Sequence, residues 1–580
     1  MNGKIPMKYK YKRRFPIMKK MLALLLTATM LLSMCAFSTA MAEEKPLMTI
    51  DIYDEAANYH GIQTGWFGKV IKDRFNLELN IIAPQVAGSS IYATRAAEGN
   101  LGDLIIMDKN TFKECVGAGL IKDIGDKLPE LENLKPYKLQ IDTFNTNLGA
   151  AEGVYYGIPD QMTDTSPVSL TAEMVYSSPQ VRWDLYKAAG SPKVENLDGL
   201  LDLLAKIHEI HPTNDAGDPA YPISLWPDWD NNDNMSGPAN VVQLTTWYGD
   251  KVKGSAILKP DNTFTKITDK TAGYYTITKF INKAYQMGLV DPESFEQDWN
   301  SVCSKISAGQ IDLIWYNWEI GFWNSQERMN NGTAFQVIPL EDGLFYGDAD
   351  SYYGSTRAWG VGSKVEGEKY DRVMELIDWL ASPEGLVYQH CGIEGFTYEV
   401  NEKGKYNQIN DNALMDNLPV PEEFGGGGYQ DGNNAINQWL CASICTNPAT
   451  GETYDVKFWE TYIEKNMTEM KREWMAHFDA ENSVDWMKKN GKLLASPNVS
   501  VALEVDTNDI TLIRNDINKV LCKYTWQMFA AETDEDFEAL WDKMDKEMEG
   551  LDYNTLYEFD CAKWQVEVDA KVAAAAAFAE

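Results

Sequence analysis

The chain has 580 residues and a formal net charge of −34 at pH 7, with 52 Lys and Arg against 86 Asp and Glu. So acidic a chain repels nucleic-acid phosphates and anionic lipid, and we expect neither as a partner. Hydrophobic residues make up 44% and aromatic residues 12% of the sequence, which excludes an intrinsically disordered protein. The length predicts more than one domain.

The first 42 residues have the layout of a secretory signal peptide. Basic residues gather in 1–20 without an acid, an apolar run follows over Met21–Phe37, and Ala40-Met41-Ala42 forms a cleavage site. The run is near the lower limit for a membrane span, which disfavours a membrane anchor. Leu32-Ser33-Met34-Cys35 looks like a degraded lipobox, the site at which lipoproteins are cleaved and acylated. We expect cleavage after Ala42, with a lipid anchor at Cys35 as the alternative.

Motifs for metals and phosphates are missing. Seven of the eight cysteines follow the signal peptide, and no His-rich segment accompanies the pair Cys441 and Cys445. The aspartate-rich loop at 228–239 lacks the Gly and Glu that an EF-hand requires at its sixth and twelfth positions, although a calcium site of another type stays open. No G-x-x-x-x-G-K-[ST] motif occurs. We therefore expect no metal and no cofactor.

The region after the signal peptide alternates strands and helices. Met48, Ile50 and Ile52 alternate with polar residues and predict a strand. An amphipathic helix is predicted over 65–75, and further strands over 77–82 and 104–107. This alternation is typical of βαβ units and a mostly parallel sheet.

A second, helix-rich region is predicted after Pro159. Apolar residues at helical spacing indicate buried helices over 197–207 and 373–380, and an acidic, aromatic stretch indicates C-terminal helices over 529–557 on the second lobe. We expect 311–316 to be a strand that returns to the first lobe and 357–362 to be the strand that leaves it again. The expected domains are 46–162 with 312–356, and 163–311 with 357–580.

Several segments resemble the extracellular solute-binding proteins of ABC importers, family 1. Ala97–Ile106, Val181–Gly190 and Lys305–Ile311 follow the family's order, and Gly385–Glu399, which contains Glu394-Gly395, resembles its signature. The similarity covers almost the whole mature chain and is greatest to the oligosaccharide-binding lipoproteins of Gram-positive bacteria. It implies an α/β, periplasmic-binding-protein-like fold of two α/β lobes, joined by hinge strands, with a ligand cleft between them. Trp183-Asp184 reverses the family's order, and the degraded lipobox puts the anchor in doubt.

Aromatic side chains supply the candidate binding residues. A sugar has apolar faces and a rim of hydroxyls, so a site for it needs flat rings together with polar groups. The stretches 226–232 and 315–323 offer both, and the second follows a predicted strand end, where α/β folds place their ligands. The resemblance places a stacking ring near Trp318. The alternative is that these rings fill the core. The predicted ligand-binding residues are Tyr53, Asp54, Trp66, Trp226, Asp228, Trp229, Trp247, Tyr316, Asn317, Trp318, Trp323, Tyr353, Trp359 and Glu394.

The resemblance implies a monomeric, non-enzymatic substrate-binding subunit of an ABC transporter. Such a protein captures a carbohydrate, here expected to be an oligosaccharide, outside the cell and delivers it to membrane permease subunits. One alternative is a secreted glycoside hydrolase, which needs two carboxylates around the scissile bond. Another is a binder of peptides or small polar ligands on the same fold. The richness in aromatic residues favours sugars.

Overall fold

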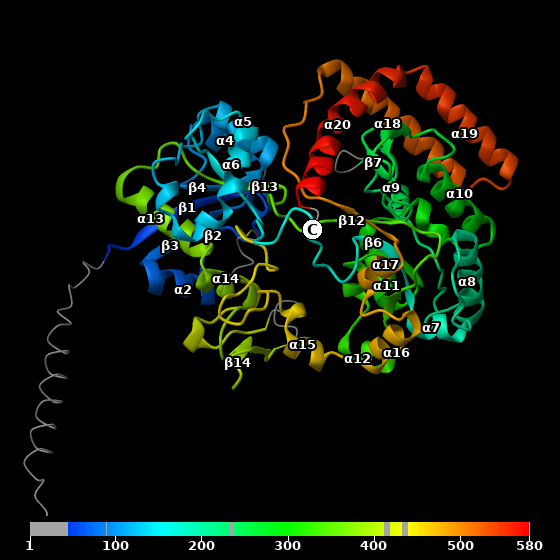
Figure 1. Ribbon diagram of the computed structural model, residues 1–580, viewed down its shortest axis with the longest axis horizontal. Helices are drawn as coiled ribbons and strands as arrows, with labels where there is room; N and C mark the ends of the chain where they lie inside the picture. Colours follow the sequence, from blue (N-terminus) through cyan, green and yellow to red (C-terminus); the bar gives the residue numbers. More distant parts are fainter. Residues whose placement is uncertain (1–44, 89, 232–235, 411–417, 432–438, 579–580) are drawn as a thin grey trace, which may run out of the picture.

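The computed structural model describes residues 45–88, 90–231, 236–410, 418–431 and 439–578. The predicted signal peptide and Cys35 lie outside the described residues. Two bodies stand side by side in Figure 1, and each has its own hydrophobic core. We call residues 45–162 with 357–465 the first body, and residues 175–345 with 466–578 the second body.

A six-stranded sheet organises the first body. Its order is β2 (Gly61–Ile62), β3 (Leu77–Ile82), β1 (Met48–Asp54), β4 (Leu104–Asp108), β13 (Arg357–Val361) and β5 (Gly157–Pro159). Strand β1 is parallel to β3 and to β4, which confirms the predicted βαβ arrangement, whereas β13 is antiparallel to both of its neighbours.

Alternate residues of these strands pack on opposite faces of the sheet. Ile50 and Ile52 belong to the larger core, beneath α2 (Gly65–Phe75) and α13 (Gly367–Leu380). Tyr53 and Ile105 belong to a smaller core on the other face. That face is covered by α4 (Ser90–Ala97), α5 (Lys109–Gly117) and α6 (Lys138–Asn147).

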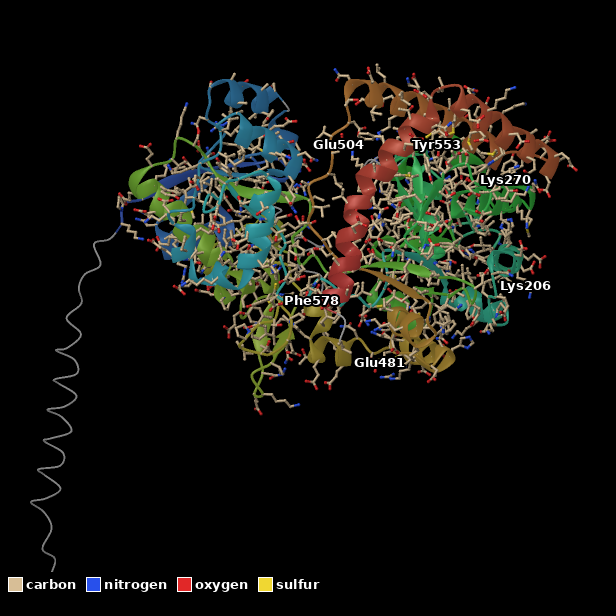
Figure 2. All side chains as sticks on the ribbon, turned by 45° about the horizontal axis from the view of Figure 1, so that its top comes forward. Lys206, Lys270, Glu481, Glu504, Tyr553 and Phe578 are labelled. Carbon is tan, nitrogen blue, oxygen red and sulfur yellow. The ribbon has the colours of Figure 1, made fainter. Side chains whose placement is uncertain are left out.

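The second body is built around a three-stranded sheet in the order β10 (Leu313–Tyr316), β6 (Ser177–Arg182), β11 (Phe335–Val337). Helices surround it in one continuous core: α7 (Trp183–Ala188), α8 (Leu197–Ile210), α9 (Ala239–Leu244), α10 (Gly273–Gln286), α11 (Trp299–Ala308), α16 (Glu469–Phe478) and α17 (Ser483–Lys489). The predicted C-terminal helices also pack here, as α18 (Asn508–Phe529), α19 (Asp534–Glu549) and α20 (Tyr553–Ala577). Figure 2 shows α20 running from Tyr553 to Phe578 along the second body.

Two strands were correctly predicted but assigned to the wrong lobe. Strand β10 pairs with β6 in the second body, and β13 pairs with β4 and β5 in the first body. The segments 312–345 and 357–465 consequently belong to the bodies opposite to those expected. Both strands are buried and apolar, so their sequences fit either sheet, and pairing between distant segments selects one.

The chain crosses between the bodies three times, near 163–174, 346–356 and 465. The crossings are tied to one another: the carboxylate of Asp350 accepts hydrogen bonds from the backbone amide and the hydroxyl of Thr171, at 2.9 and 2.7 Å. Asn147 of α6 donates to the hydroxyl of Ser500 at 3.0 Å, which links the first body to the segment before α18. Among the residues that the structure describes, no helix has the length and apolarity needed to cross a membrane.

Candidate ligand-binding site

Eight aromatic rings meet at the C-terminal end of β10 in the second body, and we call them the aromatic cluster. They come from the segment before β6, the loop after Leu225, the start of α11, and the end of β10 with the turn that follows it. Each ring has its centroid within 6.5 Å of another member's centroid. The members are Tyr176, Trp226, Trp229, Trp299, Trp315, Tyr316, Trp318 and Phe322.

The inner layer of the aromatic cluster is buried. Trp226 and Trp315 stack face to face, with centroids 5.3 Å apart and an angle of 4° between the rings. Both are almost fully excluded from solvent, at 0% and 2% exposure, and Tyr316 beside them is equally buried. This layer anchors the rings above it to the core.

The outer layer is partly open to solvent. Trp318 stacks on Tyr316 at 5.0 Å, and Trp299 lies edge-on to Trp318 at 5.2 Å. Trp229 packs against both tryptophans at 4.8 and 6.0 Å, and all three tryptophans are half-buried. At the margin Tyr176 is 48% and Phe322 is 37% exposed. Large rings that keep an exposed face after packing are available to a ligand.

A buried carboxyl group holds the turn that carries Trp318. Glu319, which begins a short 3₁₀ helix, is 1% exposed, and one of its oxygens accepts the backbone amides of Trp315 and Tyr316 at 2.7 and 2.8 Å. Burial raises the pKa of Glu319 to about 8, against the opposing effect of the two amide hydrogen bonds. The end of β10 is thereby fixed relative to the outer rings.

The second polar support is Asp228, which is exposed. Its carboxylate accepts the backbone amide of Trp299 at 3.2 Å, while Asp298 caps the same helix by accepting the amide of Ser301. These contacts position the indole of Trp299 at the start of α11. They also bring together the loop at 226–229 and the helix start, which lie about 70 residues apart.

The outer layer suits the apolar face of a sugar ring. Carbohydrate CH groups pack on aromatic faces, and the hydroxyl rim needs polar partners nearby. Asp228 and the half-buried Asn317 lie in the same loops, and the backbone amide of Asn317 donates to the carbonyl of Tyr176. The arrangement has the elements of a binding platform.

Comparison with known proteins identifies the fold. No family model and no curated protein matches the sequence. The structure is similar to that of the alginate-binding protein AlgQ2, with 15% sequence identity, coverage of 90% of this chain and 98% of that chain, and a TM-score of 0.54. FusA, an ABC-transporter substrate-binding protein of S. pneumoniae solved in complex with kestose, is also similar. The sequence identity is 15%, the alignment covers 90% of this chain and 99% of FusA, and the TM-score is 0.56. A third similar structure is an HMO-binding, ABC-transporter-associated solute-binding protein from Bifidobacterium longum infantis. Its sequence identity is 14%, the alignment covers 91% of this chain and 100% of that chain, and the TM-score is 0.58.

The chain has the fold of the solute-binding proteins of ABC transporters. This confirms the predicted α/β, periplasmic-binding-protein-like fold.

Within this solute-binding fold, six of the predicted ligand-binding residues come together at the aromatic cluster: Trp226, Asp228, Trp229, Tyr316, Asn317 and Trp318. Of these, Trp226 and Tyr316 form the inner layer and contribute support rather than an open face.

Four other predicted tryptophans are core residues, contrary to the expectation that they face a ligand. Trp66 is stacked on Tyr429, and Trp359 lies inside the sheet on β13. Trp247 donates its indole N–H to the hydroxyl of Ser177. Trp323 donates its indole N–H to the backbone carbonyl of Thr333, and the guanidinium of Arg328 lies over its ring. Their exposures are 0%, 1%, 0% and 8%, so we leave them out of the candidate site.

Tyr53 and Asp54 end β1, as predicted, but they are 3% and 0% exposed. One oxygen of Asp54 accepts the amide of Ala56 at 3.0 Å, and burial raises its pKa well above the ordinary value. The polar groups at this edge of the solute-binding fold include the ion pair between Glu55 and Arg357 at 3.1 Å. Tyr353 is half-buried against Tyr352 in a crossing segment. Glu394 is exposed on the first body, away from the aromatic cluster.

Sequence reasoning missed Trp299, Tyr176 and Glu319. Asp298-Trp299 has the form of a helix cap followed by the first helical residue, which is a local signal that places Trp299 at a helix start. Tyr176 precedes β6, which pairs with β10. The hydrophobic periodicity of the sequence does not reveal that pairing. The role of Glu319 depends on its burial, which only the packed structure shows.

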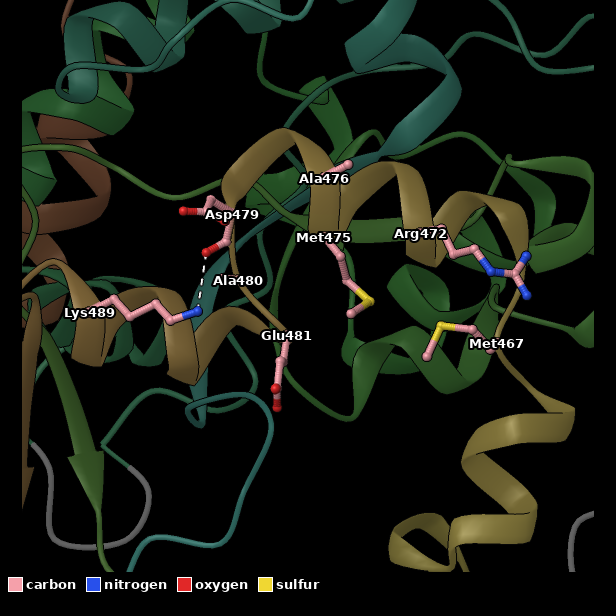
Figure 3. Close-up of a pocket in the computed structure, with 8 residues that line it drawn as sticks. All are labelled: Met467, Arg472, Met475, Ala476, Asp479, Ala480, Glu481 and Lys489. Carbon is pink, nitrogen blue, oxygen red and sulfur yellow. Dashed lines mark hydrogen bonds between the residues drawn. The ribbon is translucent and has the colours of Figure 1, made fainter.

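A separate pocket opens on the second body beside α16 and α17 (Figure 3). Its volume is about 520 Å³, and Lys489 at its edge donates to the carbonyl of Asp479 at 3.3 Å. The lining contains methionines, alanines and charged side chains but no aromatic ring, so it lacks the platform that a sugar requires. The described residues contain no group of three or more His, Cys, Asp or Glu able to hold a metal ion.

Proposed function

We propose that this protein is the extracellular substrate-binding subunit of an ABC transporter, and that it captures a carbohydrate on the aromatic cluster. The observation that carries the proposal is the partly exposed outer layer of Trp229, Trp299 and Trp318 at the end of β10, on a solute-binding fold. Solved proteins of this fold are described as binders of alginate, kestose and HMO. An oligosaccharide, with several rings in series, matches a row of several indoles.

The exposed rings favour sugars over charged ligands. Where cationic side chains contact aromatic rings in the described chain, they do so outside the aromatic cluster, as Arg328 does over Trp323 at 3.4 Å. Among the described residues no cationic side chain covers the outer faces, so these faces are available to the CH groups of a sugar. A peptide binder would need a charged clamp for the termini, and the described carboxylates Asp228 and Asp298 beside the rings are engaged with backbone amides of α11.

The two-body layout supports the proposed delivery of the ligand to permease subunits. We expect the two bodies to close around a ligand by hinge motion at the three crossings. The ligand favours closure only to the extent that it binds the closed form better. A monomer that is secreted or attached to the cell surface, partnered by permease subunits, completes the proposal.

The alternative function, a glycoside hydrolase, has little support in the residues of the aromatic cluster. Glycoside hydrolysis requires two carboxylates that reach the scissile bond. Glu319 is 1% exposed and already accepts two backbone amides, so it cannot approach a bound sugar without leaving its position. Binding without chemical change is the better fit.

Calorimetry with a panel of oligosaccharides tests the proposal, with mass spectrometry of the recovered ligand. We expect at least one oligosaccharide to bind and to be recovered intact. Shortened sugars that accumulate with time would identify an enzyme instead. A chain that binds peptides and no member of the panel would also contradict the proposal.

A further inference from the structure

The segments that carry the aromatic cluster are almost free of basic residues. They contain one, Lys305, which follows Trp299 by six positions on α11. The ammonium of Lys305 is bound by the carboxylates of Asp291 and Glu293, at 2.5 and 2.7 Å, so its charge is already offset. The segments in question are 175–177, 225–231, 299–308 and 313–323.

Two exposed carboxylates stand beside the rings. Asp228 accepts the backbone amide of Trp299 at 3.2 Å, and Asp298 accepts the hydroxyl and the amide of Ser301 at 2.7 and 2.9 Å. These two hydrogen bonds from Ser301 lower the pKa of Asp298, so its carboxylate is ionised at neutral pH. Within the described part of the chain, neither carboxylate is paired with a cation, so both charges act on a group that approaches the rings.

The thiol of Cys303 responds to this negative charge. Cys303 lies about one turn after Trp299 on α11 and is half-buried. Burial raises the pKa of the thiol to about 11, and the nearby acids Glu319, Asp228 and Asp298 add to the rise. Since the pKa of Glu319 is about 8, this residue is mostly protonated at neutral pH. Asp228 and Asp298 therefore supply the charge beside the rings.

On the first body, the cations at the ligand edge of the sheet are offset by acids. Strands β1, β4 and β5 end, and β13 begins, at this edge, where α/β folds bind their ligands. Arg357 is paired with Glu55 at 3.1 Å. Burial lowers the pKa of Lys109, and the charges of Asp160 and Asp108 oppose that fall. An acidic sugar would find no unopposed positive charge at this edge.

This charge distribution selects among carbohydrates. An acidic group on a sugar stacked over the outer rings would approach Asp228 and Asp298 with no cation to offset the repulsion. Repulsion between unit charges about 5 Å apart near a protein surface weakens binding by about tenfold or more. The hydroxyls of a neutral sugar can instead donate to these carboxylates. We propose, on the basis of the proposed function, that the aromatic cluster selects neutral oligosaccharides and rejects those that carry carboxylate or sulfate groups.

The test begins with the oligosaccharide that binds most tightly in a calorimetric panel of neutral and uronate-containing members. One primary hydroxyl of this ligand is oxidised to a carboxylate, and the same derivative is also prepared as its primary amide, which has nearly the same shape and no charge. Both derivatives are titrated at low salt into the natural chain, Asp228→Asn and Asp542→Asn. Asp542 is exposed on α19, which Figure 1 shows well away from α11, so its replacement removes the same charge at a distance.

We expect the tightest ligand to be neutral, and its carboxylate derivative to bind the natural chain about tenfold more weakly than the amide. This difference should shrink in Asp228→Asn and persist in Asp542→Asn. A tightest ligand with acidic groups, or a carboxylate that binds as well as its amide, would overturn the proposal and leave the proposed function intact. A difference that Asp228→Asn leaves unchanged would also overturn it. Failure of every oligosaccharide to bind would instead contradict the proposed function, and this inference with it.

Discussion

Two stacked aromatic pairs, one in each body, show how similar rings take different roles. In the first body Trp66 lies over Tyr429 at 5.5 Å and 4°, and its indole N–H donates to the carbonyl of Tyr429 at 2.9 Å. In the second body Trp318 lies over Tyr316 at 5.0 Å and 20°. Trp66 is fully buried and its polar atom is paired, whereas Trp318 keeps part of its surface open. Stacking alone therefore does not mark a binding site, and exposure after packing decides.

The largest effect is expected in the buried pair. Trp66→Ala removes a fully buried indole and leaves a cavity, so the free energy of unfolding should fall by about 3–5 kcal/mol. Denaturant titration measures this loss. The affinity of the variant that stays folded should match that of the natural chain, and a selective loss of affinity would place Trp66 in the site.

The next largest effect is the pH dependence of stability that comes from Glu319, the residue that holds the turn carrying Trp318. Burial raises the pKa of Glu319 from 4.5 to about 8 in the folded chain, so between these values the folded state retains a proton that the unfolded state has lost. The contribution of Glu319 to stability is accordingly greatest below pH 4.5 and is lost as pH rises to 8, a change on the order of a few kcal/mol. Glu319→Gln does not titrate and should flatten this decline.

Melting temperatures at several pH values from 5 to 8 check the prediction for Glu319. Other groups, such as Asp160, whose pKa burial raises to about 6, titrate in both proteins, so the difference between the two curves isolates Glu319. Parallel curves would show that Glu319 is ionised throughout the range.

A smaller effect is expected for the open pair. Trp318→Ala should weaken oligosaccharide binding by about 1 kcal/mol or more, because an aromatic face is lost, with little change in stability. Isothermal calorimetry gives the affinity and thermal melting gives the stability. A drop in melting temperature at unchanged affinity would show that Trp318 has a structural role and does not contact the ligand.

The smallest effect is expected at the polar support of Trp299. Asp228→Ala removes a carboxylate that accepts the amide of Trp299, and Asp298 still caps the same helix. The loss in stability should be about 0.5–1 kcal/mol, the range for a helix cap. Asp228→Asn, which retains an accepting oxygen, should recover most of it in thermal melts. A loss well above that range would mean that Asp228 supports more than one helix start.

The local elements of the first body were predictable because they depend on neighbouring residues. The spacing of Ile50 and Ile52 indicated β1, and the amphipathic pattern indicated α2 at the same bounds as observed. The placement of β10 and β13 was not predictable, since each pairs with strands more than 100 residues away. Trp318 was proposed from its place after a predicted strand end together with the family resemblance, and the structure places it in the half-buried outer layer.

Exposure could not be predicted for individual rings. The burial of Trp66 depends on Tyr429, which lies 363 positions further along the chain. Trp229 and Trp299 become neighbours only when the loop and the helix start meet through Asp228. The sequence therefore indicated an aromatic site, but not which rings remain open.

The most direct test of the central claim is a side-by-side calorimetric titration of one bound oligosaccharide into four proteins: the natural chain, Trp299→Ala, Trp318→Ala and Trp323→Phe. Trp323 comes from the same segment as Trp318 but is buried, with its indole N–H bound to a carbonyl, so it is a matched control. The account predicts weaker binding for the first two variants and natural affinity for Trp323→Phe. Natural affinity in both Trp299→Ala and Trp318→Ala would contradict it.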